Sequence, residues 1–291
     1  MLLEISHHTL YRYSQPVSFS PHRLMVRPME GHDVQIRSSI LRLQPAHRLR
    51  WLHDVFDNSI AIADFTEPAA ELRVESLVTV EQYNTNPFDF VLDPEATRLP
   101  FLYRPEELPD LLPYLQRDHP ADEEALRHWL RPFLKPGGGT ATLDFLTALN
   151  QSIPLAFTYT RREEPGVQSP GETLRRRAGS CRDFALLFME AARHLGLAAR
   201  FVSGYLCESG HVRFDAASGA THAWAEIYLP GAGWKGFDPT CGLLAADHHV
   251  RVAVARDPRQ ATPIRGAFLG PAAAFLGLEV TVKARAITAA S

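Results

Sequence analysis

The sequence predicts an α+β protein in which an N-terminal antiparallel β-sandwich precedes a domain with a helix packed on an antiparallel sheet. Three observations predict this class. Residues 1–95 alternate between apolar and polar positions, a helical period of apolar residues follows Cys181, and three strand-like segments come after that helix. Because these strands follow the helix in one run, the second half is expected to be a helix packed on an antiparallel sheet.

The composition is that of an ordinary globular protein. Of its 291 residues, 45% are hydrophobic and 22% are charged, so a substantial core can be buried. This length favours two domains over one. The 30 basic and 33 acidic residues are intermixed and give a net charge of −3. We therefore expect no nucleic-acid partner and no polybasic membrane anchor.

The cysteine content and the absence of long apolar segments indicate the cellular compartment in which the protein is expected. We expect no secretory signal, because the first residues lack a basic segment followed by a long apolar run, and no apolar stretch is long enough to cross a bilayer. The three cysteines, Cys181, Cys207 and Cys241, cannot all pair within one chain and are too few for a disulfide framework. We expect a cytoplasmic protein with a free thiol and no membrane partner.

The N-terminal region, residues 1–95, is predicted to be an antiparallel sandwich or barrel. Four segments alternate apolar and polar residues: 2–14, 34–45, 48–65 and 71–83. In the last of them one face carries four apolar residues, with Ser76 as the polar exception: Leu72, Val74, Val78 and Val80. Asp57-Asn58 interrupts the third segment and predicts a hairpin turn. Exposed strand edges in such a domain would allow a homodimer.

A Pro-rich linker with short helices is predicted for residues 96–140, and a second domain for residues 141–291. Helical patterns cover about 122–134 and 142–153, and Gly137-Gly138-Gly139 separates them. A further helix begins at Cys181, because five apolar residues fall on one face before Gly196: Phe184, Leu187, Phe188, Ala191 and Leu195.

The segments after this helix are predicted to be strands. Residues 199–207, 221–230 and 233–240 are rich in β-branched and aromatic residues, and the sequence PGAG predicts a tight hairpin between the last two.

Cys181 is the candidate nucleophile. Unpaired backbone N–H groups and the helix dipole at a helix start favour the thiolate, which is the reactive form. Gly179 permits another chain to approach closely, and the backbone N–H of Cys181 can donate to an oxyanion. Taken alone, however, a cysteine in such a protein is more often a buried structural residue.

His222 and Asp238 strengthen the candidate. They lie 16 positions apart, at the start of one predicted strand and the end of the next. Pairing of the two strands would bring the Asp238 carboxylate against the His222 imidazole and fix its tautomer. If the sheet lies across the helix start, the three residues form a nucleophile, a base and a group that orients the base.

Three segments resemble the bacterial transglutaminase-like superfamily, which is related in core fold to transglutaminases and papain-like cysteine proteases: GSCRDFA, THAWAEIYLPGAGWKGFDPT and HVRVAVARDPRQATPIRG. The N-terminal region resembles the sandwich that precedes the catalytic domain in many of these proteins. The resemblance implies that Cys181 attacks an amide carbonyl, His222 exchanges protons with the thiol and the leaving amine, and Asp238 supports His222.

Oxyanion-binding and substrate-binding residues are less specified. Tyr159 lies where the family often has an aromatic residue near the nucleophile, and Gln168 is the alternative donor through its amide. Trp224, with Trp234 and Phe237, either lines an acyl-donor groove or belongs to the scaffold. Alternate aromatic residues in strands favour the scaffold.

Two acidic residues near the predicted triad have ordinary explanations. Asp183 lies in the first turn of the predicted helix, where an acidic side chain favoured by the helix dipole is usually a surface residue. Glu226 lies in the strand that His222 opens, and we expect no catalytic role for it.

Cys241, Asp247, His248 and His249 suggest a metal site, but they lack the paired spacing of zinc ligands, and adjacent histidines on a strand point to opposite faces. A structural role is favoured. The sequence has no EF-hand pattern. We therefore expect no metal and no cofactor.

The predicted function is cysteine-dependent acyl transfer through a Cys181 thioester. The expected partner is a peptide or protein with an amide side chain or an isopeptide bond. Water or an amine can resolve the thioester, since both need the same proton transfers. Hydrolysis is favoured because water needs no acceptor site. The alternatives are a transglutaminase or amide ligase and, in another class, a non-catalytic interaction module on the same fold.

Overall fold

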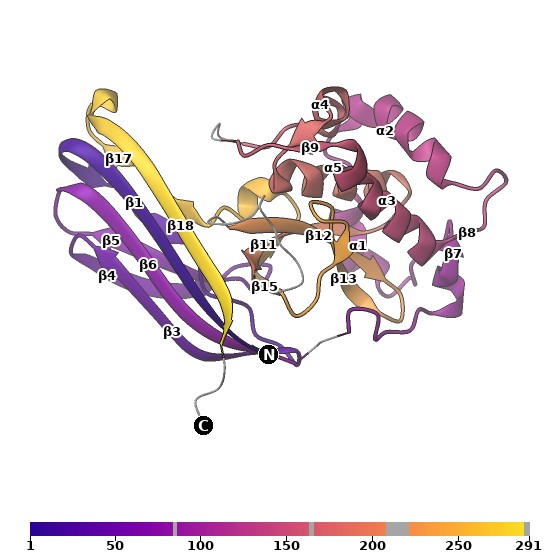
Figure 1. Cartoon of the computed structure of the whole chain (residues 1–291), viewed down its shortest axis with the longest axis horizontal. Coiled ribbons are helices and arrows are strands. Elements are labelled where there is room, and N and C mark those ends of the chain that lie inside the picture. The colour runs from indigo at the N-terminus through magenta and orange to yellow at the C-terminus, as the bar shows by residue number, and fades with distance from the viewer. Residues whose placement is uncertain (84–85, 163–165, 208–220, 288–291) are drawn as a thin grey trace.

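The computed structural model describes the chain except for residues 84–85, 163–165, 208–220 and 288–291. A β-sandwich lies beside a region in which helices pack on a third sheet, which we call the α+β region (Figure 1). The predicted α+β class is confirmed. No helix in the described ranges is long and apolar enough to span a membrane.

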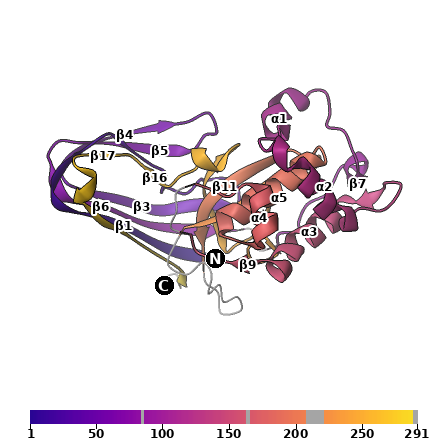
Figure 2. The ribbon, with the colours of Figure 1, turned by 90° about the horizontal axis from the view of Figure 1, so that it is seen from above.

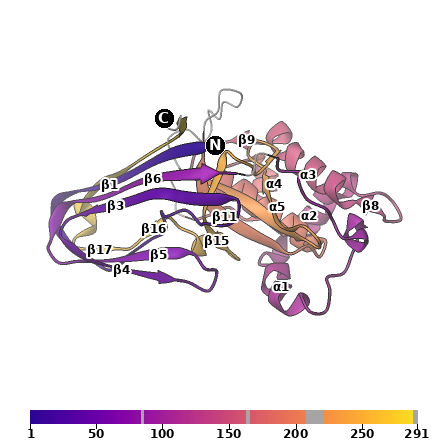
Figure 3. The ribbon, with the colours of Figure 1, turned by 90° about the horizontal axis from the view of Figure 1, so that it is seen from below.

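Two antiparallel sheets form the sandwich, and they face each other as layers in the views from above and below (Figure 2, Figure 3). One sheet has the order β17-β1-β6-β3, with β18 also paired to β1, and the other has the order β16-β2-β5-β4. The strands from the N-terminal part of the chain are β1 (Leu2–Phe19), β2 (His22–Leu24), β3 (Val34–Gln44), β4 (His47–His53), β5 (Ser59–Phe65) and β6 (Ala69–Gln82).

The alternation predicted for the last N-terminal segment is confirmed in β6. Leu72, Val74, Val78 and Val80 are buried to 1% exposure or less, and Ser76 on the same face is only 4% exposed. Side chains two residues apart share one face of a strand, so this face of β6 packs into the sandwich while the other remains more accessible. The predicted hairpin at Asp57-Asn58 is also confirmed, since it joins the paired strands β4 and β5.

The C-terminal segment belongs to the sandwich, which corrects the predicted extent of the second domain, 141–291. The strands β16 (Ile264–Arg265), β17 (Phe268–Leu269) and β18 (Phe275–Ile287) pair with β2 and β1. The yellow β18 lies along the indigo β1 in Figure 1. Without β18, the long strand β1 would present an open edge, so a segment from the far end of the chain completes the sheet.

The Pro-rich passage packs on the α+β region. It contains β7 (Arg98–Leu99), α1 (Leu108–Leu115), α2 (Glu123–Leu130) and β8 (Thr140–Ala141). The Tyr103 hydroxyl accepts a hydrogen bond from the backbone N–H of Ala198 at 2.8 Å and donates to the carbonyl of Tyr228 at 3.0 Å. The passage is therefore tied to β12 (His222–Leu229) and to the residue that precedes β11 (Ala199–Leu206) in the third sheet.

The α+β region holds the predicted helices and strands. Its sheet has the order β14-β13-β12-β11-β15 and its helices cover one face. The elements are α3 (Thr142–Ala156), β9 (Thr158–Tyr159), α4 (Pro170–Arg176), β10 (Ala178–Gly179), α5 (Cys181–His194), β11 (Ala199–Leu206), β12 (His222–Leu229), β13 (Gly233–Asp238), β14 (Leu243–Leu244) and β15 (His249–Ala255).

Helix α5 is more deeply enclosed than a helix with one apolar face. The predicted face packs on the sheet, where the Phe188 ring stacks on Phe237 at 5.5 Å. The polar residues Glu190 and Arg193 are buried as well and form an ion pair at 2.8 Å. Surrounded in this way, α5 holds its first residue in a fixed position against the sheet.

Asn58 links the sandwich to the α+β region. Its amide oxygen accepts a hydrogen bond from the backbone N–H of Val254, and its amide nitrogen donates to the carbonyl of the same residue, both at 2.8 Å. Asp54 accepts a further bond from this amide at 3.0 Å. The Asn58 side chain thus pairs with strand β15 much as a neighbouring strand would, and it is completely buried.

We expect the Asn58→Ala variant to lose about 3 kcal/mol of unfolding free energy, because two buried backbone groups of Val254 lose their partners. Urea denaturation followed by circular dichroism would measure this loss. Gln15→Ala, on an exposed part of β1, is the control and should leave the unfolding free energy nearly unchanged. A loss below about 0.5 kcal/mol in Asn58→Ala would contradict the link.

Candidate active site

Cys181 is the first residue of α5, as predicted. The chain enters the helix from β10, which runs parallel to β9 with Gly179 opposite Tyr159. A Cβ atom on Gly179 would lie 2.9 Å from Cβ of Asp183, so only glycine fits where the chain passes over the first helical turn. Cys181 is 7% exposed, which makes it a nearly buried thiol at a helix N-terminus.

Asp183 is completely buried, so the prediction of a surface residue is wrong. Its carboxylate accepts hydrogen bonds from the backbone N–H and hydroxyl of Ser180 at 2.8 and 2.9 Å and from the backbone N–H of Gln168 at 2.7 Å. Arg162 forms an ion pair with it at 2.9 Å. Burial raises the pKa of Asp183, but the bonds from Ser180 and Gln168 outweigh it, and the pKa is lowered.

Asp183 therefore fixes the turn before Cys181 to the loop that contains Gln168. From its sequence position, Asp183 is predicted to be a carboxylate favoured by the helix dipole, and it does lie in the first turn of the helix. What the sequence position did not reveal is the loop folded over that carboxylate, since the contacts join residues 15 positions apart.

Asp183→Ala is expected to reduce the unfolding free energy by about 3 kcal/mol, because several buried donors and a buried arginine lose their acceptor. Urea denaturation measures the loss, with Asp144→Ala in the first turn of α3 as a control at another helix start. Equal, small effects in both variants would show that Asp183 acts only through the helix dipole.

Gln168 is not available as an oxyanion donor. Its side-chain nitrogen has two hydrogens, and these are directed to the Ala178 carbonyl at 3.3 Å and the Asp183 carboxylate at 3.1 Å. Both donors are used within the protein. Gln168 instead holds the chain that leads to Cys181.

Tyr159 is the predicted oxyanion residue that the fold brings to Cys181. Its strand β9 lies beside β10, and its ring meets Phe184 edge-on at 6.5 Å between centroids. Burial, followed by the charge of Cys181 and a hydrogen bond with it, raises the pKa of the Tyr159 hydroxyl. The hydroxyl therefore keeps its proton at neutral pH and can donate it beside the sulfur.

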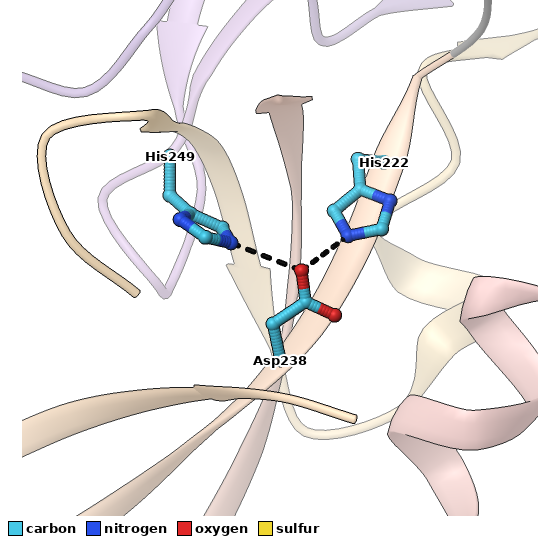
Figure 4. Close-up of side chains that lie close together, drawn as sticks. All are labelled: His222, Asp238 and His249. Atoms are coloured by element: carbon cyan, nitrogen blue, oxygen red, sulfur yellow. Dashed lines mark hydrogen bonds and ion pairs between the residues drawn. The ribbon is translucent and has the colours of Figure 1, made fainter. Parts of the chain in front are cut away.

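His222 and Asp238 form the predicted pair across β12 and β13. His222 Nε2 lies 2.7 Å from Asp238 Oδ2, and both side chains are buried (Figure 4). The other carboxylate oxygen, Oδ1, accepts the backbone N–H of Thr240 at 2.9 Å. Adjacent antiparallel strands thus bring together two residues 16 positions apart, as their spacing predicted.

In this pair, the charge of each side chain shifts the pKa of the other. Burial lowers the pKa of His222, but the carboxylate of Asp238 and the nearby Cys181 outweigh burial, so the pKa is raised. For Asp238, burial raises the pKa, but His222 and His249 outweigh it, so the pKa lies well below its usual value. At neutral pH the pair is therefore an imidazolium and a carboxylate.

The second nitrogen of His222 is the one available to Cys181. Nδ1 is buried and makes no hydrogen bond of normal geometry with the part of the chain that the structure describes. Cys181 is nevertheless close enough to raise the pKa of the ring. One nitrogen thus binds the orienting carboxylate, and the other is free to exchange a proton with the thiol.

His249, the first residue of β15, is a site residue that sequence reasoning missed. Its Nε2 lies 3.0 Å from the same Asp238 oxygen that contacts His222. The two histidines lie on either side of that oxygen (Figure 4). In the sequence, His249 was only one of several candidate metal ligands, because nothing in its spacing indicated that β15 lies near Asp238.

His222, Asp238 and His249 are also the group, among residues with described positions, whose donor atoms could hold a metal ion. These atoms lie within 4.8 Å of one another, but the nitrogen-to-oxygen distances of 2.7 and 3.0 Å are those of hydrogen bonds. A metal would have to displace both bonds.

The other residues weighed as metal ligands in the sequence, where a structural role was favoured, do not join this group. Cys241 Sγ lies 3.8 Å from the Asp238 carbonyl, and His248 pairs with Asp247 at 3.4 Å.

The remaining predicted residues belong to the scaffold. Trp224 is 1% exposed, and its ring stacks beside His222 at 6.2 Å between centroids. Phe237 lies in the core under α5, and the Trp234 ring carries the Arg200 guanidinium 4.2 Å from its centroid. Glu226 is buried and paired with Arg200 at 2.7 Å and with Arg251 at 3.1 Å.

The sequence matches two known families in the order that the fold suggests. Residues 3–81 match the family described as the bacterial transglutaminase-like N-terminal region, and residues 134–239 match the transglutaminase-like superfamily. The first match covers strands of the sandwich. The second covers α3, α5 and the strands that carry His222 and Asp238.

Individual relatives cover most of the chain. An uncharacterized protein of Mycobacterium tuberculosis is 30% identical over 272 residues, which cover 90% of this chain and 86% of that protein. One of Mycobacterium leprae is 25% identical and covers 96% and 98%. A crystal structure described as "a Putative Cysteine Protease from Cytophaga hutchinsonii" has a TM-score of 0.72 at 20% identity, covering 98% and 90%. The last likeness concerns the fold.

Fold and family matches together define a cysteine-type enzyme class. The chain belongs to the bacterial transglutaminase-like family of the transglutaminase-like superfamily.

Proposed function

We propose that the protein catalyses cysteine-dependent acyl transfer on peptide or isopeptide amides, with water as the acceptor. The observation that carries the proposal is the arrangement of the His222 ring. Nε2 is held by Asp238, Nδ1 makes no hydrogen bond of normal geometry within the described ranges, and Cys181 lies close enough to raise the pKa of the ring. This is the arrangement that a nucleophile, a base and an orienting carboxylate require.

In the first step, the Cys181 sulfur attacks the amide carbonyl and forms a carbon–sulfur bond. The imidazolium of His222 gives its Nδ1 proton to the amine nitrogen, the carbon–nitrogen bond breaks, and the amine leaves. In the second step, His222 takes a proton from water as the water oxygen attacks the thioester. The carbon–sulfur bond then breaks, a carboxylic acid is released, and the Cys181 thiolate and the His222 imidazolium are restored.

The oxyanion formed in each step needs donors that are already in position. The backbone N–H of Cys181 at the start of α5 and the Tyr159 hydroxyl beside the sulfur are the two candidates. Gln168 contributes to the position of Cys181 and makes no contact with substrate in this mechanism.

Tyr159→Phe is expected to lower kcat by about 100-fold, the usual effect of removing one oxyanion donor, with little change in KM. Steady-state kinetics on the substrate found below would measure it. Tyr83→Phe, in an exposed position of the sandwich, is the control. An unchanged kcat would assign the oxyanion to backbone donors alone.

Peptide and isopeptide libraries, incubated with and without a primary amine, test the proposed reaction when the products are weighed by mass spectrometry. We expect acid and amine fragments whose yield the added amine does not change. Amine adducts would assign the protein to the transglutaminase or ligase alternative. Products that persist in Cys181→Ala would contradict the thioester, and the absence of any product would favour the non-catalytic module.

A further inference from the structure

We propose that His249 is a positioning residue. Its neutral ring donates an N–H hydrogen bond to the Asp238 carboxylate and so holds that carboxylate against His222. The proposal rests on the proposed function, because this contact affects catalysis only if His222 acts on Cys181. It extends the site from three side chains to four, with Asp238 shared between two histidines of different roles.

The backbone of His249 is fixed from two sides. Its N–H donates to the Ala246 carbonyl at 2.9 Å, and its own carbonyl accepts the side-chain N–H of Gln82 at 2.9 Å. Gln82 is the last residue of β6, so the sandwich contributes to the placement of His249. This position is therefore set by the packing of both regions.

The hydrogen bonds of the His249 ring define which nitrogen carries the proton. The backbone N–H of Ala246 donates to Nδ1 at 3.4 Å, so Nδ1 is an acceptor and the ring proton lies on Nε2. Nε2 can then donate to Asp238 Oδ2 at 3.0 Å. Burial, together with the charges of His222 and His248, lowers the pKa of His249 despite the opposing effect of Asp238, and the ring stays neutral at pH 7.

The two histidines differ in whether one ring nitrogen remains without a hydrogen-bond partner in the described part of the chain. His222 binds Asp238 through Nε2 and has Nδ1 free for Cys181, whereas both nitrogens of His249 are engaged. Only His222 can exchange a proton with the thiol. His249 acts through Asp238, whose carboxylate accepts hydrogen bonds from both rings and from the backbone N–H of Thr240.

Trp224 supports both rings. It stacks beside His222 at 6.2 Å and meets His249 edge-on at 5.1 Å. The Trp224 ring occupies space that only glycine leaves open, since a Cβ on Gly204 would lie 2.6 Å from it. A rotation of Asp238 away from His222 would thus leave one histidine unpaired in a closely packed space.

His249→Gln and His249→Leu separate hydrogen bonding from packing. Glutamine can present an N–H near the position of Nε2, whereas leucine cannot donate. We expect the rate of Cys181 alkylation by iodoacetamide at pH 7 to fall about 10-fold or more in His249→Leu, as for other partners that orient a functional group. In His249→Gln it should stay within about 3-fold of the wild-type rate. His128→Leu, at an exposed position of α2, is the control and should leave the rate unchanged.

Nuclear magnetic resonance of ¹⁵N-labelled histidine adds a readout specific to position. The Nε2–H proton of His222, bonded to Asp238, should be displaced far downfield in the wild-type protein and in His249→Gln, and weakened or shifted in His249→Leu. If His249→Leu does not fold, His249→Phe supplies a ring without a donor and is expected to behave like the leucine variant.

Several outcomes would overturn the inference. A folded His249→Leu with the wild-type alkylation rate and His222 signal would do so, and so would a His249→Gln as slow as the leucine variant. One equivalent of bound zinc in the purified protein, lost in both variants, would assign His249 to a metal site. A wild-type Cys181 no more reactive than Cys241 would instead contradict the proposed function itself.

Discussion

Replacing Cys181 by alanine is expected to lower kcat/KM by at least about 10⁴-fold, because no other thiol can form the thioester. Cys207 is completely buried, and burial raises its pKa to about 12. Burial and the charge of Asp238 also raise the pKa of Cys241. Both remain protonated at neutral pH and are poor nucleophiles.

Kinetics on the substrate found in the library experiment would measure this loss. Cys207→Ala and Cys241→Ala are the matched controls, and both should retain activity within about 10-fold. His222→Ala combined with Cys181→Ala should lose no more than Cys181→Ala alone, because the two residues act as a unit. Additive losses, or full activity in Cys181→Ala, would assign the reaction to other residues.

Asp238→Asn is expected to lower kcat/KM by about 10³- to 10⁴-fold while the fold is retained. The carboxylate accepts an N–H from each of two histidines, and an amide can present its own N–H groups to those nitrogens instead. His222 would then be held in the wrong tautomer, with Nε2 accepting the amide N–H and the ring proton on Nδ1, so Nδ1 could not take a proton from the thiol. Asp247→Asn, on the loop before β15, is the control and should have little effect.

The pH dependence of His222 supplies an independent check on Asp238. The folded-state pKa of His222 is raised above 6.5, so the stabilising contribution of the imidazolium is fully present below 6.5 and is lost as pH rises through the higher folded value. In Asp238→Asn the pKa should fall, so the proton leaves at lower pH. Titration of the His222 ring by ¹⁵N resonance measures both values, and an equal or higher value in the variant would contradict the ion pair.

Local patterns in the sequence were sufficient to predict the helix of Cys181 and the hairpin of His222 and Asp238. A helical period, a turn sequence and a spacing of 16 residues are all properties of neighbouring segments. The alternation in β6 likewise predicted its buried face, including Ser76. These predictions depend on backbone geometry that repeats along the chain.

The features that the sequence did not reveal depend on distant contacts. Strand β18 pairs with β1 from the opposite end of the chain, Asp183 is buried by a loop folded over it, and His249 reaches Asp238 from a strand that lies beyond β11 in the sheet. No local period encodes such pairings. Gln168 illustrates the same limit, since a free amide donor in the sequence is fully engaged in the structure.

The most direct test of a Cys181 thiol activated by His222 uses iodoacetamide on the native protein at pH 7. The adducts are then mapped by mass spectrometry. We predict that Cys181 is alkylated well before Cys207 and Cys241, and that His222→Ala abolishes this preference. Equal labelling of the three cysteines, or a Cys181 preference that survives His222→Ala, would contradict a thiol activated by His222.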